Sequence, residues 1–197
     1  MNLTVRMIVV LTLVGLVSGS FLAVVGMLTE ERIQQNRLEE INRAITEVVP
    51  GAVSGEVISE GDDLTIYSCL DQQGNQVGYA LLASGTGFQD IITVMAGVDL
   101  NLTQIHDLTV LEQTETPGLG AKITSEEEFL RFWEDRSLRK KIELHKPAVK
   151  SPAQLQPHQV NTITGATISS RRVVEIVNKA LEKMQTLRIE GGLGNEE

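Results

Sequence analysis

Five hydroxyl side chains crowd one short stretch near the C-terminal end of the chain, which reads NTITGATISSRRVVEIV: Thr162, Thr164, Thr167, Ser169 and Ser170. Apolar residues then recur with helical spacing as far as Leu187, so we expect an amphipathic helix that begins near Thr167 to Ser170. Unpaired backbone N–H groups and the positive end of the helix dipole favour a phosphate at such a start. N-capping by one serine or threonine is the simpler interpretation. The residues alone leave the two interpretations equally open.

The surroundings of Thr167 bear on whether its hydroxyl is open to chemistry. Gly165 and Ala166 carry little side chain, so a bulky group or a modifying enzyme could reach this hydroxyl. Threonine is a poor nucleophile at neutral pH without an adjacent base, and the sequence places no such base beside Thr167. We therefore expect a covalent modification of Thr167 to need a separate enzyme.

A second stretch, ETPGLG from Glu115 to Gly120, has the residue types of a tight turn that approaches a ligand. Pro117-Gly118 favours a turn, and a glycine at position 120 lets backbone come close to a bound group. Taken by itself, this stretch is more simply interpreted as an ordinary turn.

Composition excludes several classes of function. The formal charge of −9 argues against a nucleic-acid partner, because phosphate binding normally needs a basic face. Cys69 is the only cysteine, which excludes a disulfide framework, a Cys-x-x-Cys pair and a thiolate iron–sulfur site. His106, His145 and His158 lack ligand spacing, so we expect no metal site. Electron transfer by this chain would therefore need an organic cofactor.

The N-terminal region contains an uncharged apolar run from Met7 to Leu28, which is long enough to span a bilayer as a helix. A cleaved signal peptide would have a shorter apolar stretch and a small-x-small cleavage site, so we favour a retained anchor. Arg6 precedes the run, and Glu30 and Glu31 follow it. By the positive-inside tendency, residues 1–6 are expected in the cytoplasm and the large domain outside it.

The rest of the chain predicts a single α+β domain with an antiparallel sheet and flanking helices. A connecting helix is expected over 29–50, where Pro50 and Gly51 end it, followed by the domain over 51–190 and a flexible tail over 191–197. The expected strands, the first two joined as a hairpin by the turn signal Gly74-Asn75, are 64–70, 77–83, 91–100 and 106–113. A capping box of Ser125 with Glu128 predicts a helix over 125–138 that buries three aromatics: Phe129, Phe132 and Trp133.

Two motifs carry a resemblance to a known family. Residues 161–167, NTITGAT, resemble the flavinylation motif Asp-x-x-Ser/Thr-Gly-Ala-Thr of FMN-binding domains. The ETPGLG stretch is similar to the Glu-Thr-Pro-Gly-x-Gly loop that helps to form the flavin pocket in that family. Gly87-Phe88 is a weaker point of similarity to the same family. Within the family, the chain looks most like G subunits of Rnf ion-translocating electron transport complexes. C subunits of sodium-pumping NADH:quinone reductases are similar but usually longer.

The resemblance implies FMN linked by a phosphoester bond to Thr167, installed by a flavin transferase that uses FAD. It implies a pocket built from the following residues: Glu115, Thr116, Pro117, Gly118, Leu119, Gly120, Thr164, Gly165, Ala166 and Ser169. The residues implied for recognition by the transferase are Asn161, Thr164, Gly165, Ala166 and Thr167.

The function implied is an electron-relay subunit of a membrane complex that couples electron transfer to ion translocation, with the other subunits as partners. A membrane-anchored flavin-binding sensory module is the alternative from a different class of function, although the chain contains no motif of an output domain. Asn161 departs from the motif, which usually starts with aspartate. Asparagine keeps the shape and one acceptor oxygen but lacks the charge. We therefore expect an exchange of Asn161 for aspartate to leave flavin attachment equal or faster.

Overall fold

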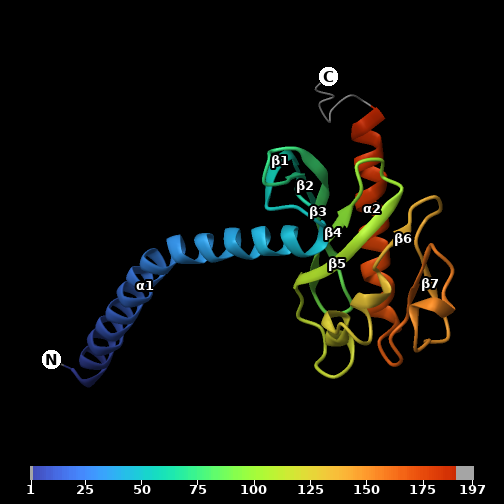
Figure 1. Cartoon of the computed structure of the whole chain (residues 1–197). Helices are drawn as coiled ribbons and strands as arrows, with labels where there is room; N and C mark the ends of the chain where they lie inside the picture. The colour runs from blue at the N-terminus through green and yellow to red at the C-terminus, as the bar shows by residue number, and fades with distance from the viewer. Residues whose placement is uncertain (1, 190–197) are drawn as a thin grey trace. The chain divides into compact units, whose positions relative to one another are not determined.

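The computed structural model describes residues 2–189 (Figure 1). The expected tail over 191–197 lies outside the described residues. By its internal contacts the chain divides into two compact units, Met1–Ile41 and Asn42–Glu197. The second unit contains everything discussed below except the apolar N-terminal helix.

Helix α1 (Leu3–Val48) contains the apolar run, and it continues without a break to Val48, shortly before residue 50, where the connecting helix was expected to end. Within the described residues it is the one helix that is long and apolar enough to cross a bilayer, with a mean hydropathy of 2.6 over its most apolar window. No residue of its most apolar window is buried, as expected of a surface that faces lipid tails.

Within residues 2–189, a six-stranded antiparallel sheet forms the centre of the second unit, with neighbouring strands in sequence order. Its strands are β1 (Ser54–Glu60), β2 (Leu64–Leu70), β3 (Gln76–Thr86), β4 (Ile91–Val98), β5 (Gln104–Glu112) and β6 (Arg136–Ser137). The predicted hairpin of β2 and β3 is confirmed. In its turn, Gly74 has a φ of +84° and Asp71 Oδ1 accepts from the Asn75 N–H at 2.8 Å.

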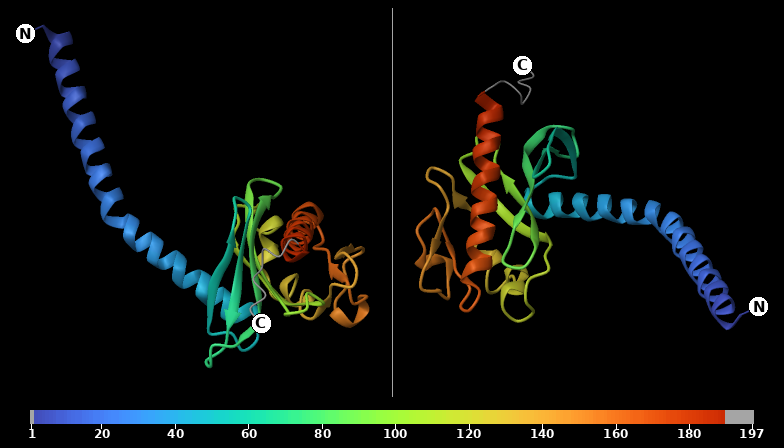
Figure 2. Two further views of the ribbon diagram at one scale, coloured as in Figure 1. Left: turned by 90° about the horizontal axis from the view of Figure 1, so that it is seen from above. Right: turned by 180° about the vertical axis from the view of Figure 1, so that it is seen from behind.

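One face of the sheet is covered by helix α2 (Thr167–Ile189), which begins where the sequence predicted. Alternate residues of β2, β3 and β4 point to this face because side chains in a strand alternate between its two sides. Together with α2 they make the main core, which includes Ile66, Leu81, Ile92, Val94, Val173 and Val177. Figure 2 (left) shows α2 nearly end-on beside the sheet.

The last turn of α1 packs on the opposite face, where Ile45, Val48 and Val49 are completely buried. Glycines in three strands make room for it. A Cβ on Gly55 would lie 2.6 Å from Ile45 Cδ1, and one on Gly97 would overlap the Val48 carbonyl. A Cβ on Gly78 would meet the Val98 carbonyl oxygen of β4 at 2.7 Å as well as Val49 Cγ1 at 3.0 Å. We call these three glycines the glycine bed. Because the end of α1 packs closely on the glycine bed, it belongs to the folded domain.

The helix predicted over 125–138 is wrong. Turns, the short 3₁₀ helix η2 (Leu130–Phe132) and strand β6 occupy this segment. The N–H groups of Phe129 and Leu130 both donate to the Ser125 carbonyl, at 2.9 and 3.0 Å. The physical reason is burial on several sides: Phe129, Leu130, Phe132 and Trp133 are all buried, and a straight α-helix would present consecutive positions to different faces. The prediction that the aromatics lie in the core is confirmed.

In the sequence between β6 and α2, the polar segment forms a small lobe that was not predicted. It contains β7 (Glu143–His145), the 3₁₀ helix η3 (Pro152–Gln154) and β8 (Gln159–Asn161). Strands β7 and β8 pair in parallel, so that His145 lies opposite Asn161. The lobe leads directly into the start of α2, and the α+β class holds for the whole domain.

Candidate functional site

The Glu115 side chain joins three segments that are far apart in the sequence. It is buried, with 4% of its surface exposed. Its Oε1 accepts from the backbone N–H groups of Phe88 and Gln89 at 2.6 and 3.1 Å, and its Oε2 accepts from the Ser169 hydroxyl at 2.7 Å. The β3–β4 loop, the loop after β5 and the first turn of α2 are therefore held together by one carboxyl group.

The loop after Glu115 turns tightly, as its sequence indicated. Gly118 has a φ of +75°, and the Leu119 and Ala121 N–H groups both donate to the Thr116 carbonyl at 3.1 Å. Gly120 then begins η1 (Gly120–Thr124). A Cβ on Gly120 would lie 2.5 Å from Glu115 Oε2 and 2.7 Å from Ser169 Oγ, so this glycine is needed where the loop packs on α2.

A second tight turn, over 163–166, precedes Thr167. The Ala166 N–H donates to the Ile163 carbonyl at 3.0 Å, and Gly165 has a φ of +86°, as a type II turn requires. Buried Ser170 holds this turn from inside, because its hydroxyl accepts from the Ile163 N–H at 3.1 Å and donates to the Ala166 carbonyl at 3.0 Å. Thr167 follows as the half-buried first residue of α2.

The two turns enclose a cavity of about 270 Å³. It is lined by Phe88, Glu115, Thr116, Leu119, Gly120, Gly165, Ala166, Thr167, Ile168 and Ser169. Three large apolar side chains form its rim and stay exposed, by 59% for Phe88 and 49% each for Leu119 and Ile168. An exposed apolar rim around a polar floor suits a ligand with a flat apolar part and a polar tail.

The charge of the cavity limits which ligands it can hold without a covalent bond. Among the described residues that line it, none is lysine or arginine, and Glu115 is acidic. A phosphate would find there only the first-turn N–H groups of α2 and the positive end of the helix dipole. The arrangement therefore offers an acceptor hydroxyl, Thr167, and apolar contacts, but no cation to retain a free phosphate monoester.

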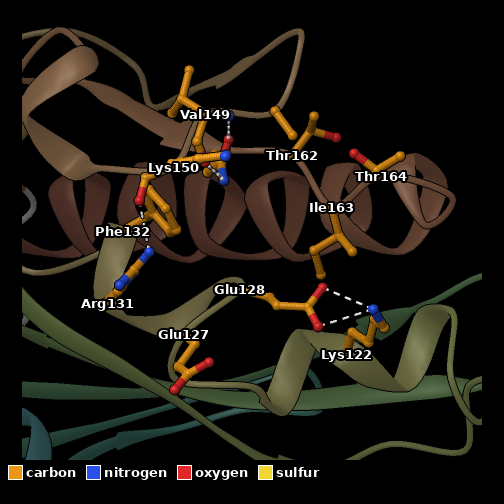
Figure 3. A pocket seen from close by; sticks show the side chains of 12 residues that line it. Lys122, Glu127, Glu128, Arg131, Phe132, Val149, Lys150, Thr162, Ile163 and Thr164 are labelled. Atoms are coloured by element: carbon orange, nitrogen blue, oxygen red, sulfur yellow. Dashed lines mark hydrogen bonds and ion pairs between the residues drawn. The ribbon is translucent and has the colours of Figure 1, made fainter.

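A second, larger cavity of about 610 Å³ lies on the other side of the turn over 163–166. We call it the flank groove (Figure 3). Its lining includes Lys122, Glu128, Arg131, Lys150 and Thr164. Lys122 pairs with Glu128 at 2.9 Å, and Arg131 Nη2 donates to the Lys150 carbonyl at 2.8 Å. Of the charged side chains that line the flank groove, Lys122 and Glu128 are thus paired with each other, whereas the Arg131 guanidinium keeps its charge beside a neutral carbonyl.

The predicted site residues separate into three groups. The structure brings Glu115, Thr116, Leu119, Gly120, Gly165, Ala166, Thr167 and Ser169 together around the first cavity. Pro117 and Gly118 shape the loop without lining that cavity, whereas Thr164 and Asn161 line the flank groove instead. Asn161 and Ala166, which were predicted to contribute to recognition by a transferase, expose only 3% and 5% of their surfaces.

Two lining residues were not predicted. The resemblance at Gly87-Phe88 pointed to the loop that carries Phe88, but it did not include Phe88 among the implied pocket residues. Ile168 carries no clear signal in the sequence, because single exposed apolar residues are common on protein surfaces.

Comparison with known proteins gives matches along most of the chain. The FMN-binding domain family matches residues 87–182. The G subunit of an ion-translocating oxidoreductase complex from Methanosarcina acetivorans is 30% identical over 184 residues, covering 90% of this chain and 92% of that protein. The G subunit of the Na(+)-translocating ferredoxin:NAD(+) oxidoreductase complex from Acetobacterium woodii is 25% identical, with 90% of both chains covered. The C subunit of the Na(+)-translocating NADH-quinone reductase from Vibrio alginolyticus is 26% identical, covering 71% of this chain and 54% of that protein.

A solved structure supports the fold. The C subunit of the Na(+)-translocating NADH-quinone reductase from Parabacteroides distasonis superposes with a TM-score of 0.56 at 18% identity, covering 86% of this chain and 97% of that chain. The sheet with its C-terminal helix is thus the same fold.

Proposed function

The chain belongs to the family of G subunits of ion-translocating oxidoreductase complexes, and from this premise we propose that it carries FMN esterified to Thr167. In this role it relays electrons between other redox subunits of a membrane complex that couples electron transfer to ion translocation. One observation carries the proposal: the ETPGLG loop and the TGAT turn close one cavity around Thr167 at the start of α2.

The cavity fits FMN in both of its parts. The exposed rim of Phe88, Leu119 and Ile168 offers apolar surface to the isoalloxazine ring, and the first turn of α2 offers N–H groups to the phosphate. When bound, FMN supplies the reversible uptake of electrons. The chain's own residues hold the ring, shield it from competing reactions and fix the attachment point.

The charge of the cavity favours an ester over a free phosphate. A phosphate monoester carries between one and two negative charges near neutral pH, and esterification to a second alcohol leaves one. A lining without lysine or arginine among the described residues, next to Glu115, disfavours the more highly charged form. A covalent bond keeps the effective concentration of the cofactor high even where its intrinsic affinity is low.

A flavin transferase performs the attachment in this proposal, because Glu115, the acidic residue of the cavity, is already engaged with Ser169. A bond forms between Thr167 Oγ and the phosphorus of the FMN half of FAD, while the pyrophosphate bond breaks. AMP leaves with the bridging oxygen, and the hydroxyl proton passes to a base of the transferase.

The lengths of the relatives favour the G subunits over the C subunits. The chain covers 92% of the Methanosarcina G subunit but 54% of the Vibrio C subunit. A sensory module remains the alternative from another class, and it predicts that the flavin responds to a signal without passing electrons on to a neighbouring redox protein.

The same proposal includes the topology. Residues 1–6 are cytoplasmic, 7–28 cross the membrane, 29–50 connect, and the FMN domain is extracytoplasmic, which is supported by Arg6 before the span and Glu30-Glu31 after it. Outside the cytoplasm a dissociated FMN would be lost, and a tether prevents this loss.

The test is the mass and fluorescence of the protein isolated from its native membrane. We expect a mass gain of one FMN minus water, located on the peptide that contains Thr167. Thr167→Ala should abolish flavin fluorescence in a denaturing gel. The matched control is Thr164→Ala, which alters a hydroxyl on the same turn that lines the flank groove, and it should retain most of the fluorescence. Fluorescence that survives in Thr167→Ala would refute the attachment site.

A further inference from the structure

The side chain of Asn161 is engaged inside the protein on both of its polar atoms. Its Oδ1 accepts from the Val149 N–H at 2.9 Å, and its Nδ2 donates to the Val149 carbonyl at 3.0 Å. Both bonds are drawn as dashed lines beside Val149 in Figure 3. A side-chain amide offers both a donor and an acceptor in this arrangement, so the pair imitates one step of a strand ladder. We call it the Asn161 clasp.

The clasp lies at one end of the segment that presents Thr167. Asn161 is the last residue of β8, and its side chain continues the pairing of the lobe beyond the His145 position of β7. At the other end of the segment, Ser170 bonds to Ile163 and Ala166. The residues between Asn161 and Thr167 are therefore anchored from both sides, by Val149 on one side and by α2 on the other.

We propose that Asn161 is a positioning residue for flavin attachment, whose amide holds the segment before Thr167 so that the acceptor hydroxyl is presented correctly. This inference rests on the proposed attachment of FMN to Thr167. A residue with 3% of its surface exposed gives a transferase almost nothing to contact, so the side chain acts through the clasp.

An aspartate at this position would break the clasp. An ionised carboxylate can still accept from the Val149 N–H, but its second oxygen faces the Val149 carbonyl where the amide had a donor. Two acceptors then meet at a distance where a hydrogen bond had been, and the Val149 carbonyl loses its partner. The motif and the clasp thus lead to opposite predictions for Asn161→Asp, and in this chain we expect the clasp to decide the outcome.

The chain provides a matched control in a second clasp of the same kind. Asn178 of α2 is buried, its Oδ1 accepts from the Ile142 N–H at 3.1 Å, and its Nδ2 donates to the Ile142 carbonyl at 2.9 Å. A lysine flanks the clasped residue in both cases, Lys150 next to Val149 and Lys141 next to Ile142. Asn178 lies in the middle of α2, away from the turn that presents Thr167. It therefore has the same chemistry without the positioning role.

The experiment compares Asn161→Asp with Asn178→Asp in the full chain, purified in detergent. Both variants should lower Tm by a similar amount, about 5 °C, because each loses one amide pair. Flavin loading by a purified transferase with FAD is then measured well below both Tm values. We expect loading of Asn161→Asp to be slower by about tenfold or more, since small displacements of a reacting group are costly, and loading of Asn178→Asp to stay near wild type.

A pH profile separates positioning from simple loss of stability. A protonated aspartate regains a donor, so the loading rate of Asn161→Asp relative to wild type should rise as the pH falls from about 8 towards 5.5. The charged and titratable groups around position 161 are His145 in β7 and the residues of the flank groove, namely Lys122, Glu127, Glu128, Arg131 and Lys150. All of them are present in the wild-type reference, so the ratio isolates residue 161.

The outcomes are distinguishable. Equal loading defects in the two variants, or a flat pH ratio for Asn161→Asp, would overturn the positioning role. Unchanged loading of Asn161→Asp would overturn it as well. If the wild-type chain accepts no flavin, the proposed function itself fails, and the comparison of Tm values still tests the two clasps.

Discussion

At the Glu115 side chain, one carboxyl group accepts from two backbone N–H groups and one hydroxyl, so its removal leaves three donors without their partner. Glu115→Ala should therefore reduce the free energy of unfolding by about 2–3 kcal/mol and loosen the cavity around Thr167. Glu115→Gln is the matched variant, because its amide oxygen still accepts from Phe88 and Gln89, and its amide nitrogen donates to Ser169. The measurements are thermal unfolding and the yield of covalent flavin.

We expect Glu115→Gln to stay close to wild type in stability and Glu115→Ala to fall in both stability and flavin yield. Equal stability of the alanine variant and wild type would show that the three segments are held by other contacts. A glutamine variant as poor as alanine would show that the negative charge, and not the hydrogen-bond geometry, is what the site needs.

The residue scale also shows what sequence could and could not provide. The prediction that FMN is attached to Thr167 depended on a local motif and on the start of a helix. Both signals come from a few neighbouring residues. The bond from Glu115 to Ser169 and the clasp from Asn161 to Val149 join positions that are distant along the chain. Such pairs depend on how the strands and the lobe pack, and a local pattern does not contain that information.

At the scale of elements, the last turn of α1 rests on the glycine bed, and Gly97 is its most restrictive position. A Cβ there would overlap the backbone carbonyl of Val48, which cannot move aside as a flexible side chain can. Gly97→Ala should therefore displace the helix end and reduce the free energy of unfolding by about 3 kcal/mol. Gly61→Ala is the control, because its added Cβ would meet the Leu64 carbonyl oxygen at an ordinary 3.4 Å.

Thermal unfolding of both variants, with limited proteolysis of the segment around residue 48, checks this prediction. We expect Gly97→Ala to unfold at a lower temperature and to be cut faster, and Gly61→Ala to behave as wild type. If both glycine variants are equally stable, the helix end is not seated on the sheet in solution.

Elements were predictable where one physical signal dominated. The β2–β3 hairpin has strong strand residues and a turn signal, and α2 has a clear apolar face, so both predictions are confirmed. The helix predicted over 125–138 is wrong because the capping signal at Ser125 is local, whereas the apolar residues that follow are too dense for one helix face. Strands β7 and β8 are three residues each, too short for any periodicity to appear.

At the scale of the whole molecule, the proposed topology can be tested with a thiol probe. Burial raises the pKa of the Cys69 thiol to about 12, and the residue is completely buried. The native thiol should therefore not react with a maleimide in the folded protein. Ala153→Cys places a new thiol on an exposed position of η3. In intact cells it should react with a membrane-impermeant maleimide, and in inverted vesicles it should be protected.

Labelling of the unsubstituted chain after denaturation gives the control for Cys69. Reaction of Ala153→Cys only in inverted vesicles would place the FMN domain in the cytoplasm. That result would remove the retention argument for the covalent tether and would favour the sensory alternative.

The glycine bed has a practical consequence for producing a soluble form of this protein. From the sequence, an expressed soluble fragment would be started after Pro50-Gly51, which follow the helix and precede the first strand. A fragment cut there would lack Ile45, Val48 and Val49, and the sheet face around Tyr67, Cys69 and Met95 would be left open to water. Such a fragment would aggregate or pair with itself through that face. A fragment that starts at Asn42, where the compact unit begins, keeps the end of α1, which then covers this face of the sheet.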